Sequence, residues 1–214
     1  MTAFDFYSIG HSNIAAERFI AMLRAAGVNA IADVRSTPVS RFCPWFSGKT
    51  LSALLGREDM IYLPYGATLG GRPRNPDLYC DGIADYEAMA RQGEFQAGLE
   101  RLVADAARCR AHDHTAGRIC LMCAERDPLD CHRCLLVARA LAERTLTIGH
   151  ILFDGTIEPH AATEQRLLAF DRDDGDLFAP GQHGRIAAAY RRRARAVAYR
   201  AKPSNAGAKS VKES

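Results

Sequence analysis

Hydrophobic residues recur along this chain with two different spacings, which separate the predicted strands from the predicted helices. Residues 4–10 are rich in β-formers and end in Gly10, a pattern typical of a strand. Residues 14–26 place Phe19, Ile20 and Leu23 near helical spacing, and Gly27 follows as a stop signal. The predicted strands are 4–10, 29–35, 60–65, 118–124 and 147–153. The predicted helices are 14–26, 50–57, 85–108, 130–144 with Asp130 as its cap, and 161–170.

The order of these elements predicts the fold class. Strands that alternate with helices form right-handed crossovers, which build a parallel sheet between helical layers. We therefore expect an α/β fold over residues 1–170, a three-layer domain with a mostly parallel central sheet of about five strands and helices on both faces. Loops are expected at 36–49 and 69–81, and a loop as long as the second is typical of a binding segment or of disorder.

Charge is distributed unevenly over the 214 residues. Residues 1–183 hold 19 Lys or Arg against 24 Asp or Glu, a net charge of −5, whereas residues 184–214 hold nine Lys or Arg and one Glu, a net charge of +8. We expect a linker at 171–183 and a basic tail at 184–214, helical within 186–201 and disordered from 202 onward. Its Arg191-Arg192-Arg193 run predicts either contact with nucleic acid or a simply solvated surface.

The apolar runs are too short for a membrane protein. None approaches the ~20 apolar residues that span a bilayer, and the N-terminus lacks the features of a secretory signal. The expected location is therefore the cytoplasm, with no membrane partner. There are seven cysteines, an odd number, and in that compartment free, catalytic or metal-bound thiols are expected rather than disulfides.

Ionisable residues and glycines lie at or just beyond the carboxyl ends of four of the predicted strands. In an open parallel sheet, ligands bind beyond the carboxyl ends of the strands, so these residues are expected to meet at one site. They are His11 and Ser12 after the first strand, Asp33, Arg35, Ser36 and Arg41 after the second, Gly70 and Gly71 after the third, and Cys123 and Glu125 after the fourth. Polar residues at exposed strand ends are the alternative explanation.

Asp33 and Arg35 lie two residues apart in a predicted strand and therefore share one face of the sheet. A partly buried carboxylate needs a partner, which Arg35 or Arg41 can supply. The pair is consistent with an anion clamp or an oriented acid–base pair, and equally with a structural ion pair.

Cys131 lies at the predicted start of a helix, where thiolates are favoured, and His132 and Arg133 follow it. This makes Cys131 a candidate nucleophile or redox thiol, with Cys123 close to it across a short loop. The alternative is that both are small buried hydrophobic residues. His150, within a predicted strand, is interpreted as a hydrogen-bonded core residue or as a ligand.

The order Cys120, Cys123, Cys131, Cys134 has the spacing of a four-thiolate zinc site. Residues three apart in a strand point to opposite faces of the sheet, so Cys120 and Cys123 cannot both reach such an ion. Cys134 fits a core position one turn after Cys131. We therefore predict no metal site from this spacing, and the sequence leaves the cofactor undetermined.

Several motifs together resemble domain-of-unknown-function family 488 over residues 5–170. These motifs are Tyr7-Ser8-Ile9-Gly10-His11-Ser12, Asp33-Val34-Arg35-Ser36, Ser40-Arg41, Leu69-Gly70-Gly71, Met122-Cys123-Ala124-Glu125, Cys131-His132-Arg133 and His150-Ile151 followed by Gly155 and Glu158. The resemblance implies a compact α/β fold and picks out Cys123, Glu125, Cys131, His132 and Arg133. Cys120, Cys134 and the basic tail are outside the family pattern, whose name records no assigned activity.

The leading hypothesis is an enzyme that acts on a small anionic substrate, a nucleotide or nucleobase derivative being one class. The expected binding residues are Ser12, Arg35, Ser36, Arg41, Gly70, Gly71 and Arg133. The expected catalytic residues are His11, Asp33, Glu125 and His132 for proton transfer, with Cys123 or Cys131 as nucleophile or hydrogen-bond partner.

Two other hypotheses are a cysteine-based redox or sulfur-transfer protein and a nucleic-acid-associated binding module. Asp33-Val34-Arg35 resembles a motif of rhodanese-like sulfurtransferases. However, Cys123 is followed by Arg126 and Leu129 instead of the arginine expected five or six residues later. The sequence leaves the oligomeric state open.

Overall fold

A six-stranded sheet forms the centre of the molecule in the computed structural model, which describes residues 4–112, 118–170 and 181–201. The strands, in the spatial order β3-β2-β6-β1-β7-β8, are β3 (Ile61–Pro64), β2 (Val28–Asp33), β6 (Arg118–Cys123), β1 (Phe6–Gly10), β7 (Ile148–Ile151) and β8 (Ile157–Pro159). The first five are parallel, and β8 pairs antiparallel with β7. This confirms the predicted α/β class and mostly parallel sheet; the antiparallel edge strand β8 was not predicted.

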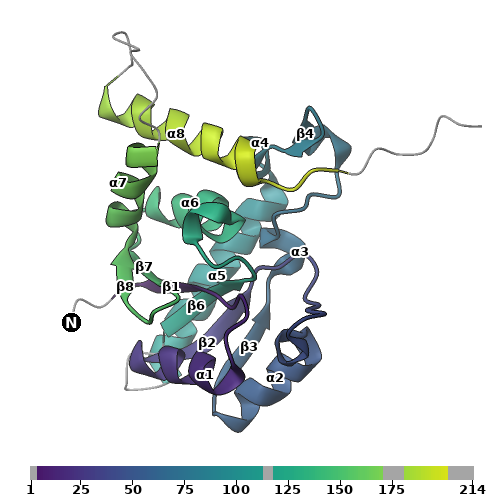
Figure 1. The fold of residues 1–214 in the computed structure, drawn as a ribbon, viewed down its shortest axis with the longest axis vertical. Helices are drawn as coiled ribbons and strands as arrows, with labels where there is room; N and C mark the ends of the chain where they lie inside the picture. The colour runs from purple at the N-terminus through teal and green to yellow at the C-terminus, as the bar shows by residue number, and fades with distance from the viewer. Residues whose placement is uncertain (1–3, 113–117, 171–180, 202–214) are drawn as a thin grey trace, which may run out of the picture.

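Helices cover both faces of the sheet (Figure 1). They are α1 (Ala16–Ala25), α2 (Gly48–Arg57), α3 (Gly66–Leu69), α4 (Tyr86–Ala90), α5 (Gly93–His112), α6 (Arg139–Ala142), α7 (His160–Phe170) and α8 (Gln182–Val197), with a π-helix at Arg133–Ala138 leading into α6. Short 3-10 turns lie at Pro44–Phe46, Pro76–Leu78 and Pro128–Asp130, and β4 (Tyr79–Cys80) pairs with β5 (Ile83–Ala84). No described helix combines the length and apolar character needed to cross a bilayer.

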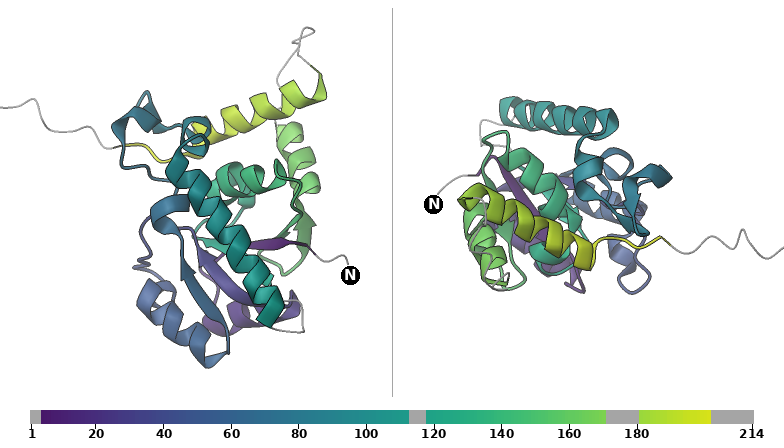
Figure 2. Two further views of the ribbon diagram at one scale, coloured as in Figure 1. Left: turned by 180° about the vertical axis from the view of Figure 1, so that it is seen from behind. Right: turned by 90° about the horizontal axis from the view of Figure 1, so that it is seen from above.

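Alternation along the strands divides the core into two hydrophobic clusters, one on each face. In β1, Phe6 packs in one cluster, whereas Tyr7 and Ile9 pack in the other. The cluster of Tyr7 includes residues of α1 and α2, and the cluster of Phe6 includes residues of α5 and the π-helix. Seen from behind, α5 crosses in front of the strands (Figure 2). The three predicted layers are therefore present.

Two helix predictions were wrong. The single helix expected at 85–108 is two helices, because α4 ends at Ala90 and α5 starts at Gly93, a residue of low helix propensity. Asp130 does not cap a helix. It ends a 3-10 turn whose cap is Asp127, the carboxylate of which accepts a hydrogen bond from the Leu129 N–H at 2.8 Å.

The helix predicted at 186–201 in the basic tail is α8, which packs against the rest of the chain. Ala189 and Tyr190 on α8 are buried, and Arg193 and Arg195 form ion pairs with Asp130 and Asp81. Within the predicted linker and tail, residues 171–180 and 202–214 lie outside the described part of the chain. Figure 1 shows α8 beside α7 at one end of the molecule.

Candidate functional site

The carboxyl ends of β1, β2 and β6 are neighbours in the sheet, and backbone pairing continues past them. The His11 N–H donates to the Cys123 carbonyl at 2.9 Å, and the Val34 N–H donates to the Met122 carbonyl at 3.1 Å. Two cavities, of about 840 and 310 Å³, adjoin this edge. Both are lined by Arg35, Ser36, Thr37 and Arg72.

Asp33 and Arg35 form a buried ion pair with two parallel hydrogen bonds. Arg35 donates from Nε to Asp33 Oδ1 at 2.8 Å and from NH2 to Asp33 Oδ2 at 2.6 Å. Tyr62 also donates to Oδ2, at 2.8 Å, and Arg35 NH2 donates to the Phe46 carbonyl at 2.8 Å. Burial opposes the charge of Arg35, but the hydrogen bonds and charge of Asp33 raise its pKa. Most of the N–H donors of the guanidinium are therefore engaged by acceptors within the protein.

His11 supports the same arginine. Its Nδ1 lies 2.9 Å from the Ser12 carbonyl, which requires an N–H there and leaves Nε2 to accept from Arg35 NH1 at 3.1 Å. The ring stacks on Phe46, with centroids 4.3 Å apart. Burial lowers the pKa of His11 to about 4, and the Arg35 charge acts in the same direction. His11 is therefore neutral at pH 7 and positions Arg35.

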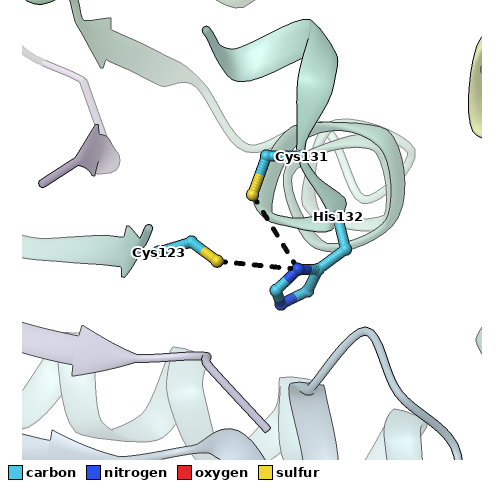
Figure 3. Close-up of side chains that lie close together, drawn as sticks. All are labelled: Cys123, Cys131 and His132. Carbon is cyan, nitrogen blue, oxygen red and sulfur yellow. Dashed lines mark hydrogen bonds between the residues drawn. The ribbon is translucent and has the colours of Figure 1, made fainter. Parts of the chain in front are cut away.

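Two thiols and an imidazole meet at the end of β6 (Figure 3). Cys123 ends β6, and Cys131 and His132 immediately precede the π-helix. The His132 Nδ1 lies 3.7 Å from Cys123 Sγ and 3.8 Å from Cys131 Sγ. Both thiols also contact one oxygen of Glu125, Oε2, at 3.0 Å. Cys123, Glu125 and His132 line the cavity.

Backbone groups fix the orientation of this cluster. The His132 Nε2 donates to the Val34 carbonyl at 2.8 Å, so Nδ1 faces the sulfurs. Gly71 permits this position, because a Cβ there would lie 2.6 Å from Cγ of the His132 ring. The Arg133 N–H donates to Cys131 Sγ at 3.4 Å.

The Arg133 guanidinium is a buried cation with mostly neutral partners. It donates to the carbonyls of Glu125 at 2.7 Å and Arg126 at 3.2 Å, and its Nε has no hydrogen-bond partner within the described structure. Only 1% of the residue is exposed. Gly10 makes room for the Glu125 carbonyl, because a Cβ there would lie 1.7 Å from that oxygen.

The two thiols differ in acidity and in access to the cavity. Burial opposes ionisation of Cys131, but contact with Cys123 and the charges of Arg133 and His132 hold its pKa well below the usual value. Burial raises the pKa of Cys123. Removal of the Glu125 carboxyl from water and the negative charge of Cys131 raise the pKa of Glu125. The thiol favoured as a thiolate is thus Cys131, which does not line either cavity.

Arg72 provides a cation at the junction of the two cavities. Its backbone N–H donates to Ser36 Oγ at 3.0 Å, and its guanidinium lies over the Tyr199 ring, 4.7 Å from the centroid. Gly70 lies beside Ser36, where a Cβ would approach Ser36 Oγ to 2.3 Å. Arg72 is exposed, and among the described residues no carboxylate pairs with it.

The predicted site residues are distributed as follows. The structure brings together His11, Asp33 and Arg35 in one group and Cys123, Glu125, Cys131, His132 and Arg133 in another. Ser36, Gly70 and Gly71 line the cavities. Ser12 and Arg41 line neither, and Arg41 is exposed.

Sequence reasoning gave no role to Tyr62, Arg72 or Tyr199, although it placed Arg72 after Gly70-Gly71 at the end of the third strand. Arg72 follows Gly70-Gly71 in a long predicted loop, which is a usable signal for a binding residue. Tyr62 lies in a strand, and Tyr199 follows α8 far along the chain, so no local pattern connects either residue with the site.

A second buried cluster lies along β7, α7 and α8. Ser8 Oγ lies 2.7 Å from His150 Nδ1, and His150 Nε2 lies 2.9 Å from His160 Nδ1. His160 Nε2 contacts the Tyr190 hydroxyl at 3.1 Å, and that hydroxyl donates to Glu164 at 3.0 Å. Burial lowers the pKa of His160 to about 4 and that of His150 well below its usual value. His150 is therefore a neutral core residue within a hydrogen-bonded chain.

The sequence pattern described as "Domain of unknown function DUF488" matches residues 15–140, more than half of the chain. The chain belongs to the DUF488 family. The matched segment contains the Cys123–His132 cluster but is shorter than the predicted resemblance over 5–170. The comparisons with curated proteins and with solved structures gave no match.

Proposed function

We propose that this DUF488 protein is an enzyme that acts on a small anionic substrate in the cavities beyond the carboxyl ends of the strands, with nucleotides as the first class to test. One observation carries the proposal. The smaller cavity is lined both by Arg72 and by the side chains of Cys123, Glu125 and His132. A cation for binding and groups for proton transfer or nucleophilic attack therefore share one cavity.

Each group has a role that follows from its contacts. Arg72 binds the anionic group, because its guanidinium has no carboxylate partner among the described residues and carries parallel N–H donors. The Tyr199 ring beside it offers a surface on which a nucleobase can stack. Glu125 lines the cavity and is the proton-transfer group. In this proposal Arg35 holds the strand ends in position and does not bind the substrate, because its guanidinium is already paired with the Asp33 carboxylate.

The binding step is tested by calorimetry on the full chain with AMP, inorganic phosphate and pyrophosphate as probes. We expect saturable binding of at least one probe and a loss of about tenfold or more in Arg72→Gln, since a charge-assisted hydrogen bond contributes roughly 1.5–3 kcal/mol. Arg41→Gln is the matched control, because Arg41 is also exposed and lines neither cavity. Absence of binding by all three probes, or equal losses in both variants, contradicts the proposal.

The catalytic step is tested by incubating the protein with nucleoside 5′-monophosphates and separating the products by chromatography. We expect turnover that Glu125→Gln reduces by about 100-fold or more, in the range of general acid–base catalysis. Asp77→Asn, which removes an exposed carboxylate lining neither cavity, is expected to leave turnover unchanged. Equal rates in the Glu125 variant would remove Glu125 from the mechanism.

A thiol redox or sulfur-transfer role is the second candidate, supported by the contact of Cys123 and Cys131 with the same carboxylate oxygen. Oxidation by glutathione disulfide would join the two sulfurs, and their two electrons and two protons would pass to two molecules of glutathione. Peptide mass spectrometry after such treatment should then show a Cys123–Cys131 disulfide. Unmodified thiols would exclude this role.

The nucleic-acid hypothesis gains no specific support. Arg193 and Arg195, two arginines of the basic segment, are paired with Asp130 and Asp81. These pairs reduce the positive charge that α8 presents to a polyanion.

A further inference from the structure

We propose that Cys123, Cys131 and His132 bind one zinc ion beside the smaller cavity. Their ligand atoms, two sulfurs and the imidazole Nδ1, all lie within 4.8 Å of one another (Figure 3). This inference rests on the proposed function, because it places a metal ion in the same site. The measurement below needs no substrate, so the zinc site and the proposed activity can fail independently.

Two of the three distances between the ligand atoms match those around a tetrahedral ion, and the third is within 4.8 Å. Bonds of about 2.3 Å to sulfur and about 2.0 Å to nitrogen give edges of roughly 3.5–3.8 Å between ligands. The observed edges from His132 Nδ1 are 3.7 Å to Cys123 Sγ and 3.8 Å to Cys131 Sγ. A small movement is therefore enough for all three atoms to contact one ion.

The hydrogen bonds around the cluster are those that orient metal ligands. The second nitrogen of a ligating histidine usually donates to a carbonyl or carboxylate, and His132 Nε2 donates to the Val34 carbonyl at 2.8 Å. Nδ1 then presents its lone pair to the sulfurs. The Arg133 N–H reaches Cys131 Sγ at 3.4 Å and would support a sulfur that carries negative charge.

Glu125 contacts both sulfurs through Oε2 at 3.0 Å and borders the cavity. Zinc sites that perform catalysis have three protein ligands and a fourth position for water or substrate, often with a carboxylate nearby as general base. Two thiolates and one imidazole with a carboxylate beside them fit this pattern.

The four-cysteine arrangement considered from the sequence is not formed. Cys120 packs in the core on the opposite face of the sheet from Cys123. Cys134 lies with His150 and His160 in another buried group that also has metal-ligand spacing. In that group the His150 Nε2 and His160 Nδ1 already share a hydrogen bond of 2.9 Å, so we assign zinc to the cluster at the cavity.

The test uses the full chain, purified under reducing conditions from zinc-supplemented medium. Native mass spectrometry should show one zinc ion per chain. After exchange with Co²⁺, the protein should show the ligand-field bands of tetrahedral cobalt and a thiolate-to-cobalt charge-transfer band. Absence of zinc together with absence of cobalt binding overturns the proposal without any variant.

Variants locate the ion. We expect a loss of about 100-fold or more in Co²⁺ affinity for each of Cys123→Ser, Cys131→Ser and His132→Gln. The loss should be this large because removing a metal ligand costs more than removing a hydrogen-bond partner of a ligand, which lowers metal affinity by about 10- to 100-fold. Cys134→Ser and the exposed Cys80→Ser are matched controls and should bind cobalt as the parent does. If Cys134→Ser loses the ion and Cys131→Ser keeps it, the metal belongs to the other group and the proposal is wrong.

Discussion

Buried charges are the strongest constraint on individual residues in this protein. Asp33 is 1% exposed and accepts four hydrogen bonds, from the Arg35 backbone and side chain and from Tyr62. Removing one partner of such a group leaves the other charge buried without compensation. The residues behind the cavity are therefore expected to affect stability as well as function.

Asp33→Ala should lower the free energy of unfolding by about 3–5 kcal/mol, because it leaves Arg35 buried without its carboxylate. Urea denaturation followed by circular dichroism measures this change. Arg24→Ala is the control. Its pair with Glu58 is solvent-exposed, so a change below about 1 kcal/mol is expected. Similar losses in both variants would show that burial does not strengthen the Asp33–Arg35 pair.

Gly10→Ala should destabilise the protein by about 3 kcal/mol or more, since the new Cβ would overlap the Glu125 carbonyl. Gly56→Ala in α2 is the opposite case. Nothing lies within 4 Å of its Cβ position, so alanine should stabilise the helix by about 0.5 kcal/mol. Thermal melts of both variants measure the two changes in stability. Changes of the same sign in both variants would mean that the added methyl group acts generally and that the Glu125 carbonyl is not the cause at Gly10.

Among the elements, the edge β7–α7–α8 depends on neutral histidines. The chain from Ser8 through His150 and His160 to Tyr190 joins the sheet to both helices by hydrogen bonds of 2.7–3.1 Å. Charging either histidine would place a cation in a buried position, and for His150 the charges of Arg133 and Arg166 oppose it further. The packing of these helices is therefore expected to weaken in acid.

Stability should fall as the pH drops from about 6.5 to about 4. An unfolded chain binds protons with its usual histidine pKa near 6.5, whereas His11 and His160 bind them only near 4 in the folded state. The unfolded state therefore binds more protons across this window, and each residue costs up to about 3 kcal/mol by its lower end. Urea midpoints from pH 7 to pH 4.5 measure this loss.

His160→Gln provides the comparison for this pH dependence. The variant lacks one of the titrating groups, so its urea midpoint should fall less steeply with acid than that of the parent. The two midpoints should be closer at pH 4.5 than at pH 7. Parallel curves would mean that His160 does not contribute.

The strands could be predicted from the sequence because each combines an apolar run with a clear stop, as Gly10 and the loop after Arg35 show. The candidate site could be located because strand ends in a parallel sheet share one edge. The π-helix at Arg133–Ala138, the short strand β8 and the break before Gly93 depend on tertiary contacts that local patterns do not carry. The opposite roles of Arg35 and Arg72 depend on which carboxylates lie nearby in space.

At the scale of the whole molecule, α8 completes the domain. Tyr190 on α8 is 3% exposed, Val197 and Tyr199 line the smaller cavity, and Ile83 forms a β-bridge with Arg200. The basic C-terminal segment thus contributes to the core and to a cavity wall.

Ending the chain at Gly181 should therefore lower the unfolding midpoint markedly, because it removes buried Tyr190 and two ion pairs at once. Differential scanning calorimetry measures the shift. Arg191→Ala, which loses only an exposed contact with Glu87 at 3.9 Å, should leave the midpoint nearly unchanged. A truncated protein as stable as the full chain would show that α8 is dispensable for folding.

The position of β1 has a practical consequence for work on this family. The shared family segment starts at residue 15, after β1, yet β1 is hydrogen-bonded between β6 and β7. A recombinant fragment limited to 15–140 would lack that strand. The backbone N–H and C=O groups of β6 that pair with β1 would then be unpaired, and such an exposed strand edge promotes self-association. Expression trials should begin upstream of residue 6.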